Sequence, residues 1–212
     1  MINVLVVDDD PLVCGHLRTI LGAAEDVTVV AEAYDGADAV EAVLRHKPDV
    51  VLMDLHMPGV DGLTAIQRIS ELDKPPVLVA LTTFDGDNHV LRAMRNGAAG
   101  YLLKSTPPKD LIGLVRVAAD GHTVMSPAVS RNLVAHAAGR RSSTSELLRD
   151  LTGRESEILA CLGNGLSNAQ IADRVHLSEG TVKNYISQIL LKLRCANRTQ
   201  AGLLAYEAGL CQ

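Results

Sequence analysis

The sequence predicts an α/β domain with a doubly wound parallel sheet, followed by a smaller domain built only of helices. Over the first part of the chain, short apolar runs of strand length alternate with amphipathic patterns of helical period, as in a sheet assembled from βα units. After Asp120 and Gly121 this alternation stops, and the rest of the chain carries only helical patterns. The flavodoxin-like strand order is the usual one for five βα units, so we expect a flavodoxin-like (βα)5 domain followed by an all-α domain.

Each element of the first domain has local signals. Strands are predicted where short apolar runs end in turn residues, at residues 3–7, 27–33, 50–53, 77–81 and 100–103. Helical patterns follow them, at residues 11–21, 36–46, 61–72, 86–96 and 107–120. Asp10 and Pro11 mark the clearest helix start, because Asp caps helices and Pro suits the first helical position.

We place the first domain at residues 1–122, a linker at residues 123–147 and the helical domain at residues 148–212. Within the linker, residues 127–137 fit a short helix. Residues 138–145 are small, polar and basic, and they cannot bury enough apolar area to stay ordered. Helices of the last domain are predicted at residues 153–163, 168–175, 179–193 and 198–208.

Composition excludes some classes of protein and favours others. Residues 1–124 carry 10 Lys and Arg against 18 Asp and Glu, whereas residues 125–212 carry 10 against 7, so the second part is the better polyanion binder. No apolar run approaches the roughly 18 residues of a membrane span, and no signal peptide precedes the first strand. The four cysteines lie far apart without metal-site spacing. We therefore expect a cytoplasmic protein with no membrane partner.

Acidic side chains follow two of the predicted buried strands. The strand at residues 50–53 runs into Asp54, and the first strand runs into Asp8, Asp9 and Asp10. Parallel strands release such side chains at one edge of the sheet, which is where these sheets bind ligands. Clustered carboxylates repel one another, and Mg²⁺ would remove that cost because it prefers oxygen ligands. Thr82 and Lys104, which end the fourth and fifth strands, are expected at the same edge.

Four fragments of this domain, in this order and spacing, resemble the receiver domain of bacterial two-component response regulators. They are Asp8-Asp9, Asp54 with Met57-Pro58-Gly59 and Asp61-Gly62, Leu81-Thr82-Thr83, and Tyr101-Leu102-Leu103-Lys104. The resemblance covers roughly residues 1–122.

The resemblance implies a role for each residue of the acidic edge. Asp54 would be the phosphoacceptor, attacking phosphorus as a carboxylate nucleophile. Asp8, Asp9, Asp54 and the backbone carbonyl of His56 would bind Mg²⁺, while Thr82 and Lys104 would bind the phosphoryl oxygens. The Tyr101 ring would swing inward when Thr82 moves toward the phosphate. Where the family commonly has a cis proline after the lysine, this chain has Ser105, so the geometry of that bond stays open.

The helix predicted at residues 179–193 has the pattern of a DNA-recognition helix. Its buried face is predicted to consist of Val182, Tyr185, Ile186, Ile189, Leu190 and Leu193. The opposite face carries small polar and cationic side chains, which are suited to base edges and phosphates. The preceding helices begin with capping boxes at Thr152 and Ser167, Ser178 caps this helix, and residues 176–178 form a turn of helix-turn-helix length.

Residues 150–210 resemble the LuxR-type helix-turn-helix through Leu151-Thr152-Gly153-Arg154-Glu155, Thr181-Val182-Lys183 and Asn197-Arg198-Thr199-Gln200-Ala201, among other fragments. With the receiver, this points to the NarL/FixJ class. The resemblance implies that Lys183, Asn184 and Ser187 reach bases or phosphates, and that Thr181 and Lys192 bind the DNA backbone. Leu191 is predicted to lie on the exposed face, away from the core.

The interpretation that combines these features is a transcription regulator, not an enzyme. Phosphoryl transfer from a sensor histidine kinase to Asp54 would switch it, and a homodimer would bind two-fold sites on double-stranded DNA. The alternative enzyme is a Mg²⁺-dependent phosphatase with an aspartate nucleophile, since Asp8 and Asp10 form a D-x-D sequence. It is disfavoured because Leu12 stands where Thr or Val is expected and no cap insertion is present. A regulator that never uses phosphate is the third alternative.

Overall fold

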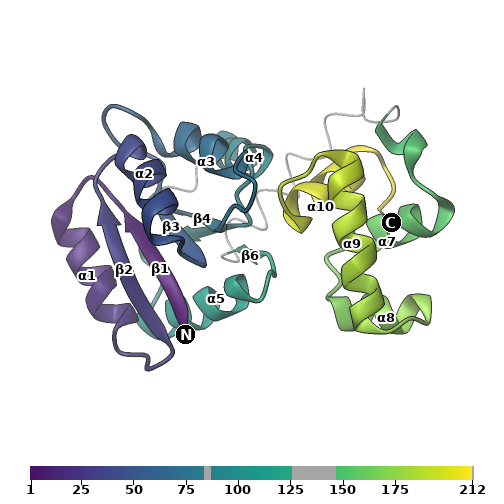
Figure 1. Cartoon of the computed structure of the whole chain (residues 1–212), viewed down its shortest axis with the longest axis horizontal. Coiled ribbons are helices and arrows are strands. Elements are labelled where there is room, and N and C mark those ends of the chain that lie inside the picture. Colours follow the sequence, from purple (N-terminus) through teal and green to yellow (C-terminus); the bar gives the residue numbers. More distant parts are fainter. Residues whose placement is uncertain (84–86, 126–146, 212) are drawn as a thin grey trace. The chain divides into compact units, whose positions relative to one another are not determined.

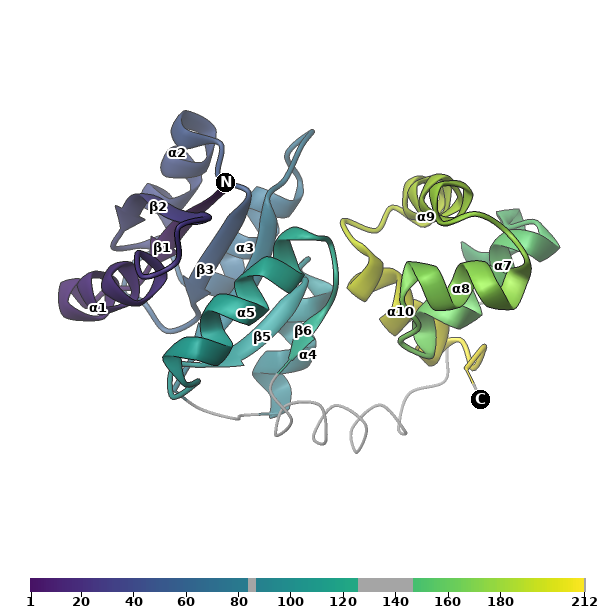
Figure 2. The same ribbon diagram turned by 90° about the horizontal axis from the view of Figure 1, so that it is seen from below.

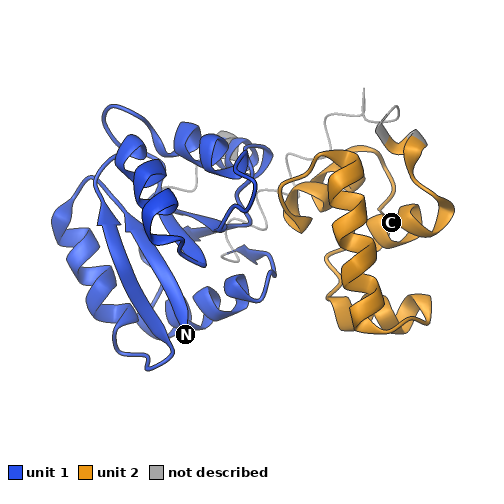
Figure 3. Cartoon of the chain, viewed as in Figure 1, with its two compact units in different colours: residues 1–133 blue, residues 134–212 orange. Residues whose placement is uncertain are grey.

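The computed structural model describes residues 1–83, 87–125 and 147–211. The chain forms two compact units, Met1–Leu133 and Val134–Gln212, shown in blue and orange in Figure 3. The short helix predicted at residues 127–137 and the polar segment at residues 138–145 lie outside the described residues.

The first unit contains a parallel sheet with the strand order β2-β1-β3-β4-β5-β6. The strands are β1 Ile2–Val7, β2 Val27–Ala33, β3 Val50–Asp54, β4 Val77–Thr82, β5 Gly100–Leu103 and β6 Val124–Met125. The flavodoxin-like order predicted for the first five strands is confirmed. The two-residue strand β6 was not predicted, because so short a segment shows no alternation. It passes so close to β5 that any side chain at Gly100 would overlap Val124.

Helices cover both faces of this sheet, as Figures 1 and 2 show. They are α1 Pro11–Leu21, α2 Gly36–His46, α3 Gly62–Ser70, α4 Asp87–Arg95 and α5 Pro108–Ala119. One core cluster joins α1 and α5 to one sheet face, where it contains Leu52, Val79 and Leu81. Because side chains alternate along a strand, the neighbouring residues Met53, Ala80 and Thr82 point to the other face, which α2, α3 and α4 cover.

Aspartates cap the N-termini of three of these helices. Asp10 Oδ1 accepts a hydrogen bond from Leu12 N at 2.9 Å, Asp35 Oδ1 accepts from Ala37 N at 2.7 Å, and Asp61 Oδ1 accepts from Thr64 N at 2.7 Å. Each bond satisfies an amide that has no partner within its helix. The third helix was predicted to begin at Asp61, but this residue is its cap and the helix begins at Gly62.

From residue 147 on, where the second unit is described, it contains a 3₁₀ helix, η1 Leu147–Asp150, and four α-helices, α7 Gly153–Gly163, α8 Asn168–Val175, α9 Glu179–Leu193 and α10 Arg198–Glu207. Both predicted capping boxes are present, at Thr152 with Glu155 and at Ser167 with Gln170. Their helices share one apolar core, which includes Ile158, Ile171, Val182 and Ile189. Among the described residues, no helix is both long and apolar enough to cross a bilayer.

Candidate functional site

The structure brings three acidic side chains together at the carboxyl edge of the sheet. Asp8 and Asp9 follow β1, Asp54 ends β3, and one carboxylate oxygen of each lies within 4.8 Å of those of the other two. Asp8 and Asp54 are buried, at 1% and 4% exposure, whereas Asp9 is exposed. Two charges that cannot be hydrated lie beside a third that can, so this edge holds concentrated negative charge.

Lys104 brings a single positive charge into this cluster. Its Nζ lies 2.5 Å from Asp8 Oδ2 and 3.1 Å from Asp54 Oδ2. The residue follows β5 and is anchored to the end of β4, because its backbone N–H donates to the Thr82 carbonyl at 2.7 Å. No cis peptide bond occurs among the described residues, so the bond between Lys104 and Ser105 is trans.

The charges in the cluster do not balance. Burial raises the pKa of Asp8, and the hydrogen bonds from Lys104 and from the Asp10 amide only partly oppose it. Burial lowers the pKa of Lys104, but its bonds to Asp8 and Asp54 outweigh this effect and leave the pKa raised. Asp8 Oδ2 makes no hydrogen bond of regular geometry, although the Lys104 ammonium lies beside it. One ammonium among three carboxylates leaves two negative charges uncompensated, which a divalent cation would balance. The carboxylate oxygens are ligands of the kind that Mg²⁺ prefers.

Thr82 and Tyr101 lie on the same face of the sheet, toward α2, α3 and α4. Both are fully buried, at 0% exposure. Tyr101 pairs in register with Ala80, two residues before Thr82, so the two side chains are diagonal neighbours on adjacent strands. The Tyr101 ring therefore lies inside the unit in this structure, and its predicted movement with Thr82 stays a prediction.

The predicted recognition helix is α9, and its two faces are as expected. Val182, Ile186, Ile189 and Leu193 are buried, while Tyr185 and Leu190 are half-buried. Lys183, Asn184 and Ser187 are exposed on the opposite face. Thr181 is half-buried beside the cap, where its hydroxyl lies 2.8 Å from the Ser178 hydroxyl. Leu191 is 79% exposed, as its position on the outer face predicts.

Lys192 differs from the other predicted DNA contacts. Its Nζ donates to Glu155 Oε2 at 2.7 Å and to the Asp150 carbonyl at 3.3 Å. The sequence resemblance assigns this lysine to the DNA backbone, but in the structure it has two partners within its own unit. Ser187 also has an internal bond, since its hydroxyl donates to the Lys183 carbonyl at 3.0 Å.

Comparison with known families covers both units. Residues 4–116 match the family described as "Response regulator receiver domain", and residues 149–205 match "Bacterial regulatory proteins, luxR family". The first match alone spans more than half of the chain. The chain belongs to the two-component response regulators. Its second unit is a LuxR-type DNA-binding domain, so the predicted family and fold class are both confirmed.

Individual response regulators are similar over nearly the whole chain. The nitrate/nitrite response regulator protein NarL of Escherichia coli strain K12 is 33% identical, with 97% of this chain and 95% of NarL covered. The crystal structure of the response regulator ChrA, from a heme-sensing two-component system, is 37% identical with a TM-score of 0.55, covering 99% and 98%. A structure of RcsB dimers bound to DNA is 26% identical with a TM-score of 0.57, covering 97% and 96%.

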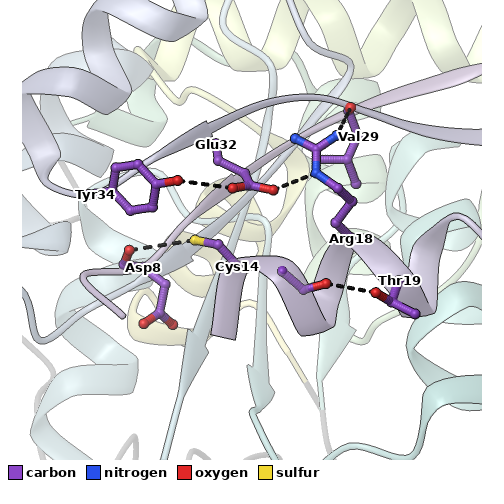
Figure 4. Close-up of polar contacts among 8 residues, drawn as sticks. Asp8, Cys14, Arg18, Thr19, Val29, Glu32 and Tyr34 are labelled. Carbon is purple, nitrogen blue, oxygen red and sulfur yellow. Dashed lines mark hydrogen bonds and ion pairs between the residues drawn. The ribbon is translucent and has the colours of Figure 1, made fainter. Parts of the chain in front are cut away.

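Two contacts made by residues of the predicted acidic site were not themselves predicted. Cys14 of α1 donates its thiol to the Asp8 carbonyl at 3.5 Å, as Figure 4 shows. Burial raises the pKa of Cys14 to about 11, so the thiol keeps its proton and remains a donor. The His56 and His89 rings lie 5.0 Å apart. Neither contact has a signal in the sequence, since each joins segments that only the fold brings together.

Figure 4 also shows how α1 is fixed to the edge strand of this receiver domain. Arg18 pairs with Glu32 at 2.5 Å and donates to the Val29 carbonyl at 3.2 Å, while the Tyr34 hydroxyl donates to Glu32 Oε2 at 3.0 Å. The bond from Arg18 holds the pKa of Glu32 below its usual range. These bonds fix α1, and with it Cys14, behind Asp8.

The glycine of the Asp61-Gly62 pair has a role beside the phosphoacceptor candidate. Gly62 begins α3, and a side chain there would overlap the carbonyl oxygen of Asp54. Its backbone N–H lies 3.3 Å from the Leu55 carbonyl and donates to it. A residue without Cβ is therefore required for α3 to start directly beside the end of β3.

Proposed function

We propose that this response regulator is a cytoplasmic transcription factor whose receiver domain accepts a phosphoryl group on Asp54 from a sensor histidine kinase. The observation that carries the proposal is the convergence of Asp8, Asp9 and Asp54 around the single ammonium of Lys104. Asp8, Asp9, Asp54 and the His56 carbonyl would hold Mg²⁺, which would neutralise charge on the incoming phosphoryl oxygens.

Each residue of the site has a separate part in the transfer. The Asp54 carboxylate attacks phosphorus, an oxygen–phosphorus bond forms, and the phosphorus–nitrogen bond to the histidine of the donor breaks. Lys104, which contacts Asp54 Oδ2 in this structure, is close enough to pair with a phosphoryl oxygen built on that carboxylate. Thr82 ends the neighbouring strand and would donate its hydroxyl to another oxygen.

The position of Asp10 argues against the phosphatase alternative. Here Asp10 Oδ1 accepts from Leu12 N and caps α1, so this carboxylate is engaged by the helix start. The same sequence feature that suggested an enzyme is thus explained by helix capping.

The phosphorylated receiver would promote dimerisation, and a dimer would place two copies of α9 on a two-fold DNA site. RcsB, which is similar in structure, has been observed as dimers on DNA. Moving such an equilibrium from nearly off to nearly on requires about 5.5 kcal/mol of differential stabilisation, part of which dimer contacts would supply. We assign residues 1–122 to the receiver, 123–147 to the linker and 148–212 to the DNA-binding domain.

The test is labelling of the full chain with acetyl phosphate and Mg²⁺, followed by peptide mass spectrometry. We expect a gain of one phosphoryl group on the peptide that contains Asp54. The Asp54→Asn variant should gain none there, whereas Asp73→Asn, which replaces an exposed aspartate on the same unit, should be labelled like the wild type. An unlabelled wild-type protein would favour the regulator that never uses phosphate.

A further inference from the structure

The contact between Lys192 and Glu155 joins the last turn of α9 to the first turn of α7. Glu155 is almost completely buried, at 2% exposure, and its carboxylate also accepts from the Thr152 amide at 2.7 Å as half of the capping box. Lys192 adds a bond at 2.7 Å to the same oxygen and another at 3.3 Å to the Asp150 carbonyl. The end of α9 is thus tied to both η1 and the start of α7.

The charges of the Lys192–Glu155 pair balance each other. The bond from Lys192, followed by that from the Thr152 amide, keeps the pKa of Glu155 below its usual range, so the buried carboxylate is charged at neutral pH. A buried charge without a partner is strongly destabilising, and Lys192 is the cation that supplies one here. Two of the three N–H groups of the ammonium are used within the protein.

A lysine in this state is poorly suited to binding DNA phosphates. Binding to DNA gains free energy when a cation displaces condensed counterions, and a lysine already neutralised by a carboxylate contributes little to that exchange. Lys183 on the same helix is different: both lysines are exposed, but Lys183 forms no ion pair with any residue that the structure describes. Lys183 and Lys192 are nine residues apart, or about 13 Å along the helix.

Resting on the proposed DNA binding by α9, we propose that Lys192 is a positioning residue rather than a phosphate contact. It fixes the C-terminal end of α9 to the first turn of α7 and thereby sets the direction in which Lys183, Asn184 and Ser187 project. Releasing this end allows the helix to tilt, which misplaces the residues at its other end. Lys192 therefore affects affinity through geometry, and Lys183 affects it through charge.

The experiment compares full-chain variants in binding to one DNA duplex, selected by the wild-type protein from a random-sequence library, over a series of salt concentrations. Lys183→Met should lower the slope of log affinity against log salt by about one unit. Lys192→Met should weaken binding at every salt concentration and leave the slope unchanged. Glu155→Gln should also weaken binding without changing the slope, because it loosens the same contact.

Hydrogen exchange on the same full-chain variants gives the second readout. In Lys192→Met, amides at the start of α7 and the end of α9 should exchange about 5- to 30-fold faster, because the Glu155 carboxylate is left buried without its cation. The double variant Glu155→Gln/Lys192→Met removes that charge while keeping a side chain that can complete the capping box, so it should regain most of the protection. Lys183→Met should not change these rates.

The outcomes separate this proposal from the function on which it rests. A slope that falls by about one unit in Lys192→Met or in the double variant would overturn the positioning role, as would tighter binding by Glu155→Gln, because both results indicate a phosphate contact. If Lys192→Met unfolds the second unit, so that its amides lose all protection from hydrogen exchange, the test uses the salt slope of the double variant Glu155→Gln/Lys192→Met instead. Failure to select any duplex would count against the proposed DNA binding itself.

Discussion

The two units each place a lysine against a buried carboxylate, and the charge balance around the two lysines differs. In the receiver, Lys104 contacts Asp8 and Asp54 while Asp9 lies nearby, so one positive charge faces three negative ones. In the DNA-binding unit, Glu155 is the only carboxylate paired with Lys192 among the described residues, and the Thr152 amide and the Asp150 carbonyl give each group a second hydrogen bond.

This difference separates a binding site from a structural contact. A hydrogen-bonded pair whose charges balance has no further need of a ligand, and its effect is to fix the elements that carry it. A cluster with surplus negative charge and a carboxylate oxygen lacking a regular hydrogen bond is stabilised only when another cation arrives. The proximity of a lysine to an acid therefore does not by itself distinguish a binding site from a structural contact, whereas the balance of charges around the lysine does.

Removing Lys104 should have the largest effect among the tests of this comparison. We expect Lys104→Met to lower the initial rate of Asp54 labelling by acetyl phosphate about 10²- to 10³-fold, the usual loss when one group that stabilises transition-state charge is removed. Lys109→Met, at an exposed lysine of the same unit, and Lys192→Met should both keep the wild-type rate. A wild-type rate in Lys104→Met would show that the surplus charge of the cluster, and not this ammonium, governs the transfer.

Much of the receiver could be predicted because its strands are continuous apolar runs that end in acidic or turn residues. The run Val50 to Met53 followed by Asp54 indicates both a buried strand and the residue that it delivers to the edge. The strand β6 was not predicted, because Val124 and Met125 form a strand only through their pairing with β5. The burial of Tyr101 likewise depends on the helices that cover its face of the sheet, which the sequence of β5 does not contain.

The DNA-binding unit shows more clearly which contacts the sequence pattern cannot predict. The helical period of α9 predicts which residues are buried, but it assigns Lys192 only to the outer face. Its partner Glu155 lies 37 residues earlier, on another helix. Helical period carries no information on such a contact, and the capping box explains Glu155 without requiring a lysine. The first domain's acidic cluster was predictable because a sheet edge gathers strand ends by a general rule, whereas the rules of helix packing do not specify which side chains of two helices meet.

Magnesium should distinguish the two lysine sites by stabilising only the first. At a Mg²⁺ concentration about ten times its dissociation constant, we expect amides of β1 and β3 to exchange about tenfold more slowly, because the ion binds the folded cluster and not the unfolded chain. Amides of α7 and α9 should be unaffected. Asp9→Asn should reduce the effect, and this exposed residue can be changed without leaving a buried group unpaired. Unchanged exchange in β1 and β3 at millimolar Mg²⁺ would argue against a dication at this edge.

The smallest expected effect is the pH dependence of the Lys192 contact. The folded pKa of Glu155 is lowered, chiefly by the bond from Lys192. A carboxylate of this kind stabilises the fold fully above its unfolded pKa of about 4.3, and the stabilisation is lost as the pH falls through the lower folded value. Exchange of the α7 amides, corrected for intrinsic rates, should therefore accelerate below about pH 4 in the wild type. Glu155→Gln/Lys192→Met should lose this acceleration, and a double variant that retained it would show that another carboxylate controls the acid stability of the unit.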